Sequence, residues 1–272
     1  MINTHFSEII TIKGLYIYPI KSCAGIEQSE LLFEDLRGAK WDRRWMFIDE
    51  NNLFHTQRQS PQMACIKTKL LSDALVISVN ESPSLIKTEV ILPFSELENG
   101  RLMQAKVWKR DVNVFDCGDL IAKSVSQFLG KRLRLVYLNP EAQAEEMSLA
   151  DSYPILLTNT ASLGELSKRV GFEIPMSRFR ANVVVSSHCA FVEDEWKKLK
   201  IGGIEIHETT HCSRCVIINT DQKTGVRAGA EPLKTLSSFR KIDQKVNFGR
   251  RMKHLCFGKI KVGDEIIVLE SL

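Results

Sequence analysis

The sequence has 272 residues, 44% hydrophobic and 26% charged, which is ordinary for a globular protein of one large domain or two small ones. Its net charge of +4 is too small to indicate nucleic-acid binding, and no apolar run is long enough to span a bilayer. Met1 to Lys13 lacks the basic and apolar blocks of a signal peptide, so we expect a cytoplasmic protein with reduced cysteines.

The first half of the chain is predicted to be mainly β-structure. Glu8 to Ile20 alternates like a half-buried strand. Short apolar runs bounded by turn residues predict further strands, the first two forming a hairpin: Trp45–Ile48, Leu53–Thr56, Ala74–Val79, Glu89–Leu92, Met103–Trp108 and Val112–Phe115. Asp116 is expected to cap a helix that runs to about Leu129, before Gly130.

The second half mixes strands and helices. Helices are expected at Thr160–Val170, before Gly171, and at Glu231–Ile242. The expected strands are Leu133–Leu138, Pro154–Leu157, Asn182–Val185, Gly203–Glu208, Cys215–Asn219, His254–Phe257 and Glu265–Leu269. The acidic stretch from Asn139 to Asp151 is the best candidate for a boundary, which divides the chain into domains 1–138 and 139–272.

The densest group of reactive side chains is His207…His211-Cys212-Ser213-Arg214-Cys215, and spacing alone leaves several hypotheses open. Two histidines and two cysteines could hold zinc, although the usual longer loop between ligand pairs is missing. Cys212 and Cys215 could also form a thioredoxin-like redox dithiol, but such a motif opens a helix, whereas this one precedes a predicted strand. A single metal-binding thiolate at Cys215, favoured by the neighbouring Arg214, is a third hypothesis. Core packing of both cysteines is the fourth.

Two other features could bind an anion. Lys21 and Ser22 follow a strand in a turn, where an ammonium, a hydroxyl and free backbone N–H groups can hold phosphate. Arginine pairs directly precede two predicted apolar strands, and a guanidinium can make bidentate contacts with phosphate or with a fused heterocycle. Solvated turns and surface salt bridges are the alternative explanations.

At these positions the sequence resembles the MOSC family, and within it the two-part group that includes the amidoxime-reducing component and its bacterial relatives. The resemblance covers nearly the whole chain. Each motif is short, but their order and spacing together are specific. They are Tyr18–Gly25, Asp42–Trp45, Thr56–Arg58, Asp116–Gly118, Asp151–Thr158, Arg178–Asn182, Cys212–Cys215, Thr220–Asp221, Thr224–Gly225, Glu231–Leu236, Phe248–Gly249 and Val262–Asp264.

The resemblance implies a mainly β protein with several helices, in which an N-terminal β-barrel domain packs on a MOSC-type β-barrel domain. It implies a molybdenum–molybdopterin cofactor with Cys215 as metal ligand and catalytic residue; pyridoxal phosphate is not expected. Lys21 and Ser22 match residues that hold the cofactor's phosphate, with Arg43 contributing. The positions that match the pterin surroundings or the metal face are Thr158, Ser162, Arg180, Asn182 and Phe248.

The resemblance also implies an oxidoreductase that reduces small N-hydroxylated or other N–O compounds. The sequence offers no ferredoxin-like C-x₄-C-x₂-C spacing, so the expected electron donor is a separate flavin, haem or iron–sulfur protein. Neither nucleic acid nor a membrane is an expected partner. The rival hypotheses are a carrier of cofactor or sulfur, with a persulfide on Cys215, and a structural zinc site at His207, His211, Cys212 and Cys215.

Overall fold

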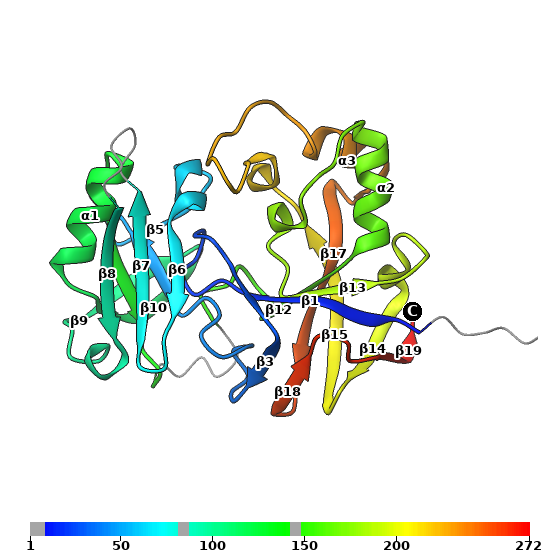
Figure 1. Cartoon of the computed structure of the whole chain (residues 1–272), viewed down its shortest axis with the longest axis horizontal. Coiled ribbons are helices and arrows are strands. Elements are labelled where there is room, and N and C mark those ends of the chain that lie inside the picture. Colours follow the sequence, from blue (N-terminus) through cyan, green and yellow to red (C-terminus); the bar gives the residue numbers. More distant parts are fainter. Residues whose placement is uncertain (1–8, 81–86, 142–147) are drawn as a thin grey trace, which may run out of the picture.

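The computed structural model describes residues 9–80, 87–141 and 148–272, and these residues form two β-rich lobes lying side by side (Figure 1). Among them, strands far outnumber the three α-helices. The mainly β fold with a few helices, predicted from the sequence, is confirmed. None of the described helices is long and apolar enough to cross a bilayer.

One lobe is built on a nine-stranded sheet. Its order is β19 (Ile266–Ser271), β14 (Trp196–Ile201), β15 (Ile204–Ser213), β17 (Lys245–His254), β12 (Ile155–Asn159), β13 (Val183–Ser186), β1 (Thr11–Ile17) and β2 (Ile26–Gln28), with β16 (Lys241–Ile242) on β17. Only the β12–β13 pair is parallel. The helices α2 (Thr160–Val170) and α3 (Leu233–Phe239) accompany this sheet (Figure 1).

The second lobe contains two smaller sheets. One has the order β5 (Phe54–His55), β4 (Trp45–Ile48), β11 (Arg134–Leu138), β10 (Arg110–Asp116) and β9 (Leu102–Val107). The other is β6 (Lys67–Leu70), β7 (Ala74–Asn80) and β8 (Lys87–Pro93). Alternate residues of these strands pack with α1 (Asp119–Leu129) in one apolar core, because a strand turns every second side chain inward.

Strands from the start of the chain belong to the large lobe. The N-terminal strand β1 pairs with β13 in the nine-stranded sheet, and β3 (Glu30–Phe33) pairs with β18 (Gly258–Lys261) near the other end of the chain. The segment that follows β1 therefore leaves the large sheet and enters the second lobe at a fixed point. The division at residues 138 and 139 stays a prediction, and residues 142–147 of the expected boundary, like Glu8 of the first expected strand, lie outside the described residues.

Helix α2 has the bounds expected from the sequence. The Asn159 side chain caps it by accepting a hydrogen bond from the amide of Ala161 at 3.0 Å, and Gly171 ends it in the left-handed region with φ 89°. Helix α1 begins later than expected, after Gly118. Asp116 is not its cap: it ends β10, where its carboxylate accepts two hydrogen bonds from the Arg134 guanidinium.

Three predictions for the C-terminal third were wrong. The expected strand at Cys215–Asn219 is a 3₁₀ helix, Val216–Asn219, whose Ile218 packs under α2 and α3; a short apolar run does not distinguish the two. The helix expected over Glu231–Ile242 is shorter, and β16 follows it. The strand expected at His254–Phe257 is absent: β17 covers Lys245–His254 and β18 begins at Gly258. The sequence did not predict β17 because the charged residues along it conceal its alternation.

Candidate functional site

Both lobes line a cleft of about 660 Å³ that is strongly cationic. The second lobe contributes the loop before β4 and the tip of the β9–β10 hairpin. The first lobe contributes the segment before β13, the end of β15 and the 3₁₀ helix Val216–Asn219. Eight lysines and arginines line it against one acid, Asp151: Lys21, Arg43, Arg58, Lys109, Arg110, Arg180, Arg214 and Arg251. This surplus of positive charge favours an anionic ligand.

Lys21 reaches this cleft from a buried position. Only 7% of its side chain is exposed, and its ammonium donates to the carbonyl of Leu149 at 2.8 Å and to Asp151 Oδ1 at 2.5 Å. Burial lowers the pKa of Lys21, and the Asp151 carboxylate opposes that effect. Burial would raise the pKa of Asp151, but Lys21, Arg58 and the Trp108 indole bring it well below its usual range. The Asp151 carboxyl is therefore ionised at neutral pH.

Arg43 holds the opposite wall of the cleft together. Its guanidinium donates to Asp42 at 2.5 Å, to Asn182 Oδ1 at 2.9 Å and to the carbonyl of Arg180 at 2.9 Å. Arg180 donates in turn to the carbonyl of Cys23 at 2.6 Å. Three residues that lie far apart in the sequence, Arg43, Arg180 and Asn182, are thus fixed side by side.

The backbone of the cleft wall is strained. Ser22, Arg43, Trp108 and Arg180 all have positive φ angles, between 49° and 69°, and all four line the cleft. Residues other than glycine seldom adopt this conformation, and such strain concentrates at functional sites. The four side chains are therefore aimed by a backbone that the surrounding contacts impose.

Cys215 lies in the cleft wall directly before the 3₁₀ helix, and its side chain is partly exposed. Arg214 was expected beside this thiol, but its guanidinium donates instead to Cys212 Sγ at 3.0 Å and to the carbonyl of Phe179 at 2.8 Å. Cys212 is buried, whereas the Cys215 thiol faces the cleft with no hydrogen bond to any described residue. Cys215 is thus the better placed of the two to bind a metal.

Lys21, Ser22, Arg43, Arg180, Asn182 and Cys215, predicted from the sequence, all line the cleft. Three further predicted residues do not. The hydroxyl of Thr158 donates to Met176 sulfur at 3.2 Å, and that of Ser162 donates to Glu193 at 2.7 Å inside the large lobe. Phe248 is fully buried within strand β17 and stacks on Phe179, an equally buried residue of the cleft wall, at 4.1 Å between centroids. Its contribution is to support the cleft wall from behind.

The four residues of the zinc alternative do not converge. His207 contacts Glu205 at 3.2 Å, His211 contacts Asp194 at 3.3 Å, and Cys212 accepts from Arg214. Over residues 9–80, 87–141 and 148–272, no three histidine, cysteine or acidic side chains lie close enough together to hold a metal ion. The local geometry therefore favours the single-cysteine hypothesis over a zinc site.

Sequence reasoning did not identify the most connected residues of the cleft. Asp151 lies at its centre, contacting Lys21, Arg58 at 3.5 Å and the Trp108 indole N–H at 3.2 Å. Arg251 donates to Ser152 at 2.6 Å. In the sequence Asp151 belongs to an acidic connection and to the Asp151–Thr158 motif, and neither feature assigns it a role in the site. The left-handed turn at the tip of the β9–β10 hairpin, which presents Trp108, has no glycine to mark it.

The chain matches known protein families over most of its length. Residues 9–132 match the MOSC N-terminal beta barrel domain, and residues 144–267 match the MOSC domain. It is 29% identical to the human mitochondrial amidoxime-reducing component 1, over 96% of this chain and 84% of that protein. It is 31% identical to bovine mitochondrial amidoxime reducing component 2, over 95% and 83%. Zebrafish molybdenum cofactor sulfurase is 32% identical over 90% of this chain but only 32% of its own length.

Proposed function

The chain belongs to the MOSC family, in the group that joins a MOSC N-terminal β-barrel domain to a MOSC domain, and from this we propose that it is a molybdenum-cofactor-dependent reductase of N-hydroxylated compounds. The observation that carries the proposal is the single cleft that gathers a free cysteine thiol and eight cationic side chains. We also propose that the protein is cytoplasmic.

The residues of the cleft fit a molybdopterin group. The cofactor is anionic at its phosphate and its dithiolene, and the cleft offers cations, hydroxyls and one accessible thiol. Arg214 Nε is buried without a hydrogen-bond partner among the described residues, which leaves a donor for a ligand. In this proposal Cys215 ligates the metal, Lys21 and Ser22 hold the phosphate, and Arg180 and Asn182 flank the pterin.

The bound cofactor would supply two-electron oxygen-atom chemistry. The overall reaction takes up two electrons and two protons, breaks the N–O bond of the substrate, and releases the amine or amidine and water. The chain's own part is to orient the substrate and keep the metal face open. Asp151, ionised beside Lys21, holds the Lys21 ammonium in place at the cleft. The electrons come from a separate protein.

A second candidate function is a carrier that holds the cofactor or its sulfur without turning over a substrate. The likeness to molybdenum cofactor sulfurase supports it, because that relative aligns over 90% of this chain. A persulfide on Cys215 would use the same accessible thiol. A carrier exchanges cofactor or sulfur but does not reduce N-hydroxy substrates.

The test is reduction of benzamidoxime by cofactor-loaded protein with a chemical electron donor. We expect turnover by the native protein, loss of turnover in Cys215→Ala, and native turnover in Cys189→Ala, whose exposed thiol lies outside the cleft. Full activity of Cys215→Ala would refute the role of this residue. Loaded native protein that never reduces the substrate would favour the carrier.

A further inference from the structure

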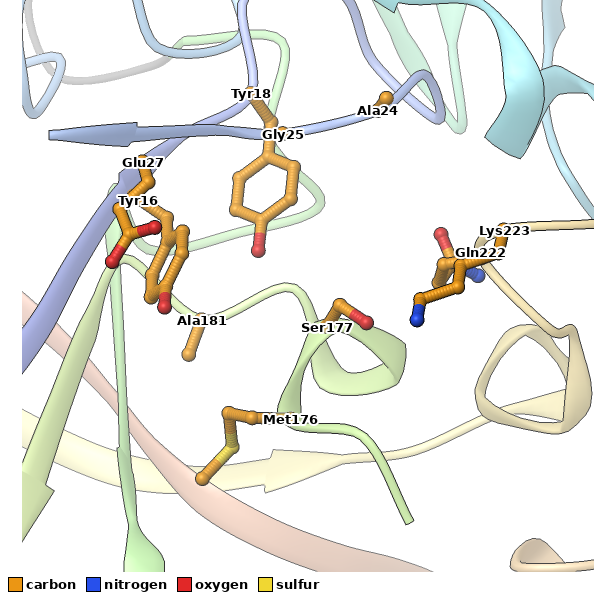
Figure 2. A pocket seen from close by; sticks show the side chains of 10 residues that line it. All are labelled: Tyr16, Tyr18, Ala24, Gly25, Glu27, Met176, Ser177, Ala181, Gln222 and Lys223. Atoms are coloured by element: carbon orange, nitrogen blue, oxygen red, sulfur yellow. The ribbon is translucent and has the colours of Figure 1, made fainter.

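A second cavity, of about 330 Å³, is lined by residues that adjoin those of the cationic cleft in the sequence (Figure 2 shows its lining). The same chain segments line both cavities, with neighbouring residues facing opposite ways. Lys21 and Ser22 face the cleft, whereas Ala24 and Gly25, a few residues later, face the second cavity. Similarly, Ala181 faces the second cavity between two neighbours that face the cleft. The volume is that of a site for one small molecule.

Tyr18 projects into this cavity from the shared wall. The residue is only 4% exposed, and its hydroxyl points into the open space of the cavity (Figure 2). That hydroxyl makes no hydrogen bond to any residue of the described chain. Burial raises its pKa to about 12, so it stays a protonated donor. Because this hydroxyl opens onto the cavity and no protein group uses it, a ligand that enters the cavity can accept its hydrogen bond.

The faces of the Tyr18 ring are engaged by the cleft arginines. The guanidinium of Arg43 lies 4.5 Å from the ring centroid and that of Arg180 lies 4.3 Å away. These cations draw electron density from the ring, which makes the hydroxyl a stronger donor toward an oxygen acceptor. Tyr18 therefore offers the cavity its hydroxyl edge, and not a stacking surface.

The remaining polar groups stand on opposite sides of the cavity. Glu27 lies beside Tyr16 on one side, and Lys223 lies on the other, with Ser177 between them (Figure 2). Within the described residues, neither the Glu27 carboxylate nor the Lys223 ammonium has an ion-pair partner. The Met176 thioether and the carbon atoms of Tyr16 and Tyr18 also line the cavity, and these apolar groups favour a ligand with a flat apolar ring. The cavity thus offers a hydrogen-bond acceptor, Glu27, on one side and a donor, Lys223, on the other, with apolar groups between them.

We propose that this cavity is a second ligand site, which binds a small aromatic carboxylate bearing an amino group. The carboxylate would accept from Lys223 and the Tyr18 hydroxyl, the ring would lie over Met176, and the amino group would donate to Glu27. The site is distinct from the cofactor cleft and does not depend on the proposed reductase activity, so each can fail without the other.

The probe for this site is 4-aminobenzoate, measured by titration calorimetry on the whole protein. A ligand of this size is expected to bind with a Kd on the order of 1 mM or below, at one equivalent. Benzoate and aniline, each lacking one of the two groups, should bind more weakly. No heat of binding at about 10 mM probe would overturn the proposal.

Variants locate the binding. Tyr18→Phe should weaken it about tenfold, the effect of one lost hydrogen bond, and Ser177→Trp should abolish it by filling the cavity from an exposed position. Lys223→Gln should weaken carboxylate binding, whereas Lys67→Gln, an exposed lysine outside the cavity, should not. Thermal unfolding confirms that each variant is folded.

Cys215→Ala separates the two cavities, because this residue lines only the cleft. We expect it to bind 4-aminobenzoate as the native protein does. Binding that survives Ser177→Trp, or that is lost in Cys215→Ala, would place the probe in the cleft and overturn the second site.

Discussion

The ion pair of Lys21 and Asp151 predicts a measurable loss of stability in Asp151→Asn. Removing one partner of a fully buried pair costs about 3–5 kcal/mol, whereas exposed pairs contribute under about 1 kcal/mol. The Lys21 side chain is 7% exposed and that of Asp151 is 49% exposed, so we place the loss between these limits, at about 2 kcal/mol. In a chain of this size that lowers the Tm by about 4–8 °C.

The pH dependence of this loss has a definite sign. The cations around Asp151 lower its pKa in the folded protein, so the carboxylate stabilises the fold above its unfolded pKa of about 4. That stability is lost as the pH falls through the lower, folded pKa. The difference between native protein and Asp151→Asn should therefore be constant near neutral pH and should close in strong acid.

The assay is urea unfolding of cofactor-free protein across a pH series. Asp111→Asn is the control, because Asp111 makes an exposed pair with Lys106 at 3.8 Å, and its loss should cost under about 0.5 kcal/mol. Equal stability of native protein and Asp151→Asn at neutral pH would refute the reasoning. The reasoning would also be refuted if the stability difference between the two proteins did not shrink as the pH falls toward the pKa of Asp151 in the folded protein.

Three further changes test the site. Lys21→Ala should retain less cofactor through gel filtration, because it removes the cation assigned to the phosphate; unchanged content would exclude that role. Asn182→Ala should cost about 3 kcal/mol in urea unfolding, since its amide bridges Arg43, the Leu156 amide and the Tyr16 carbonyl; a cost under about 1 kcal/mol would contradict this bridge. Cys212→Ser should keep stoichiometric metal, because the Cys212 sulfur is engaged by Arg214; metal loss would make it a ligand.

The sequence predicted the strands of the second lobe, except β6, and helix α2, because their periodicity and end signals are local. It predicted six cleft residues, Cys215 among them, through short motifs whose order resembles a known family. It did not predict that Arg43 would reach Asn182, 139 positions away, since nothing local encodes that contact. Asp151 was missed for the same reason: in the sequence it is one of several acids in a connection, and only the fold brings it to Lys21.

Strand β17 shows where periodicity fails. It occupies the middle of the nine-stranded sheet, yet Arg250 is buried there and the alternation of apolar residues is broken. Strand β17 is held by backbone hydrogen bonds to β12 on one side and β15 on the other, and a local sequence pattern does not reveal such partners. Ser162 is a related case: its hydroxyl, expected near the pterin, is used inside the lobe by Glu193 and by the amide of Phe191.

The most direct test of the account is the molybdenum and pterin content of the protein produced in a host that makes the molybdenum cofactor. We expect near-stoichiometric molybdenum with pterin in the native protein, and loss of the metal in Cys215→Ala. Absence of both from the native protein, in a host shown to load a known molybdoenzyme, would contradict the assignment of the cleft as a cofactor site.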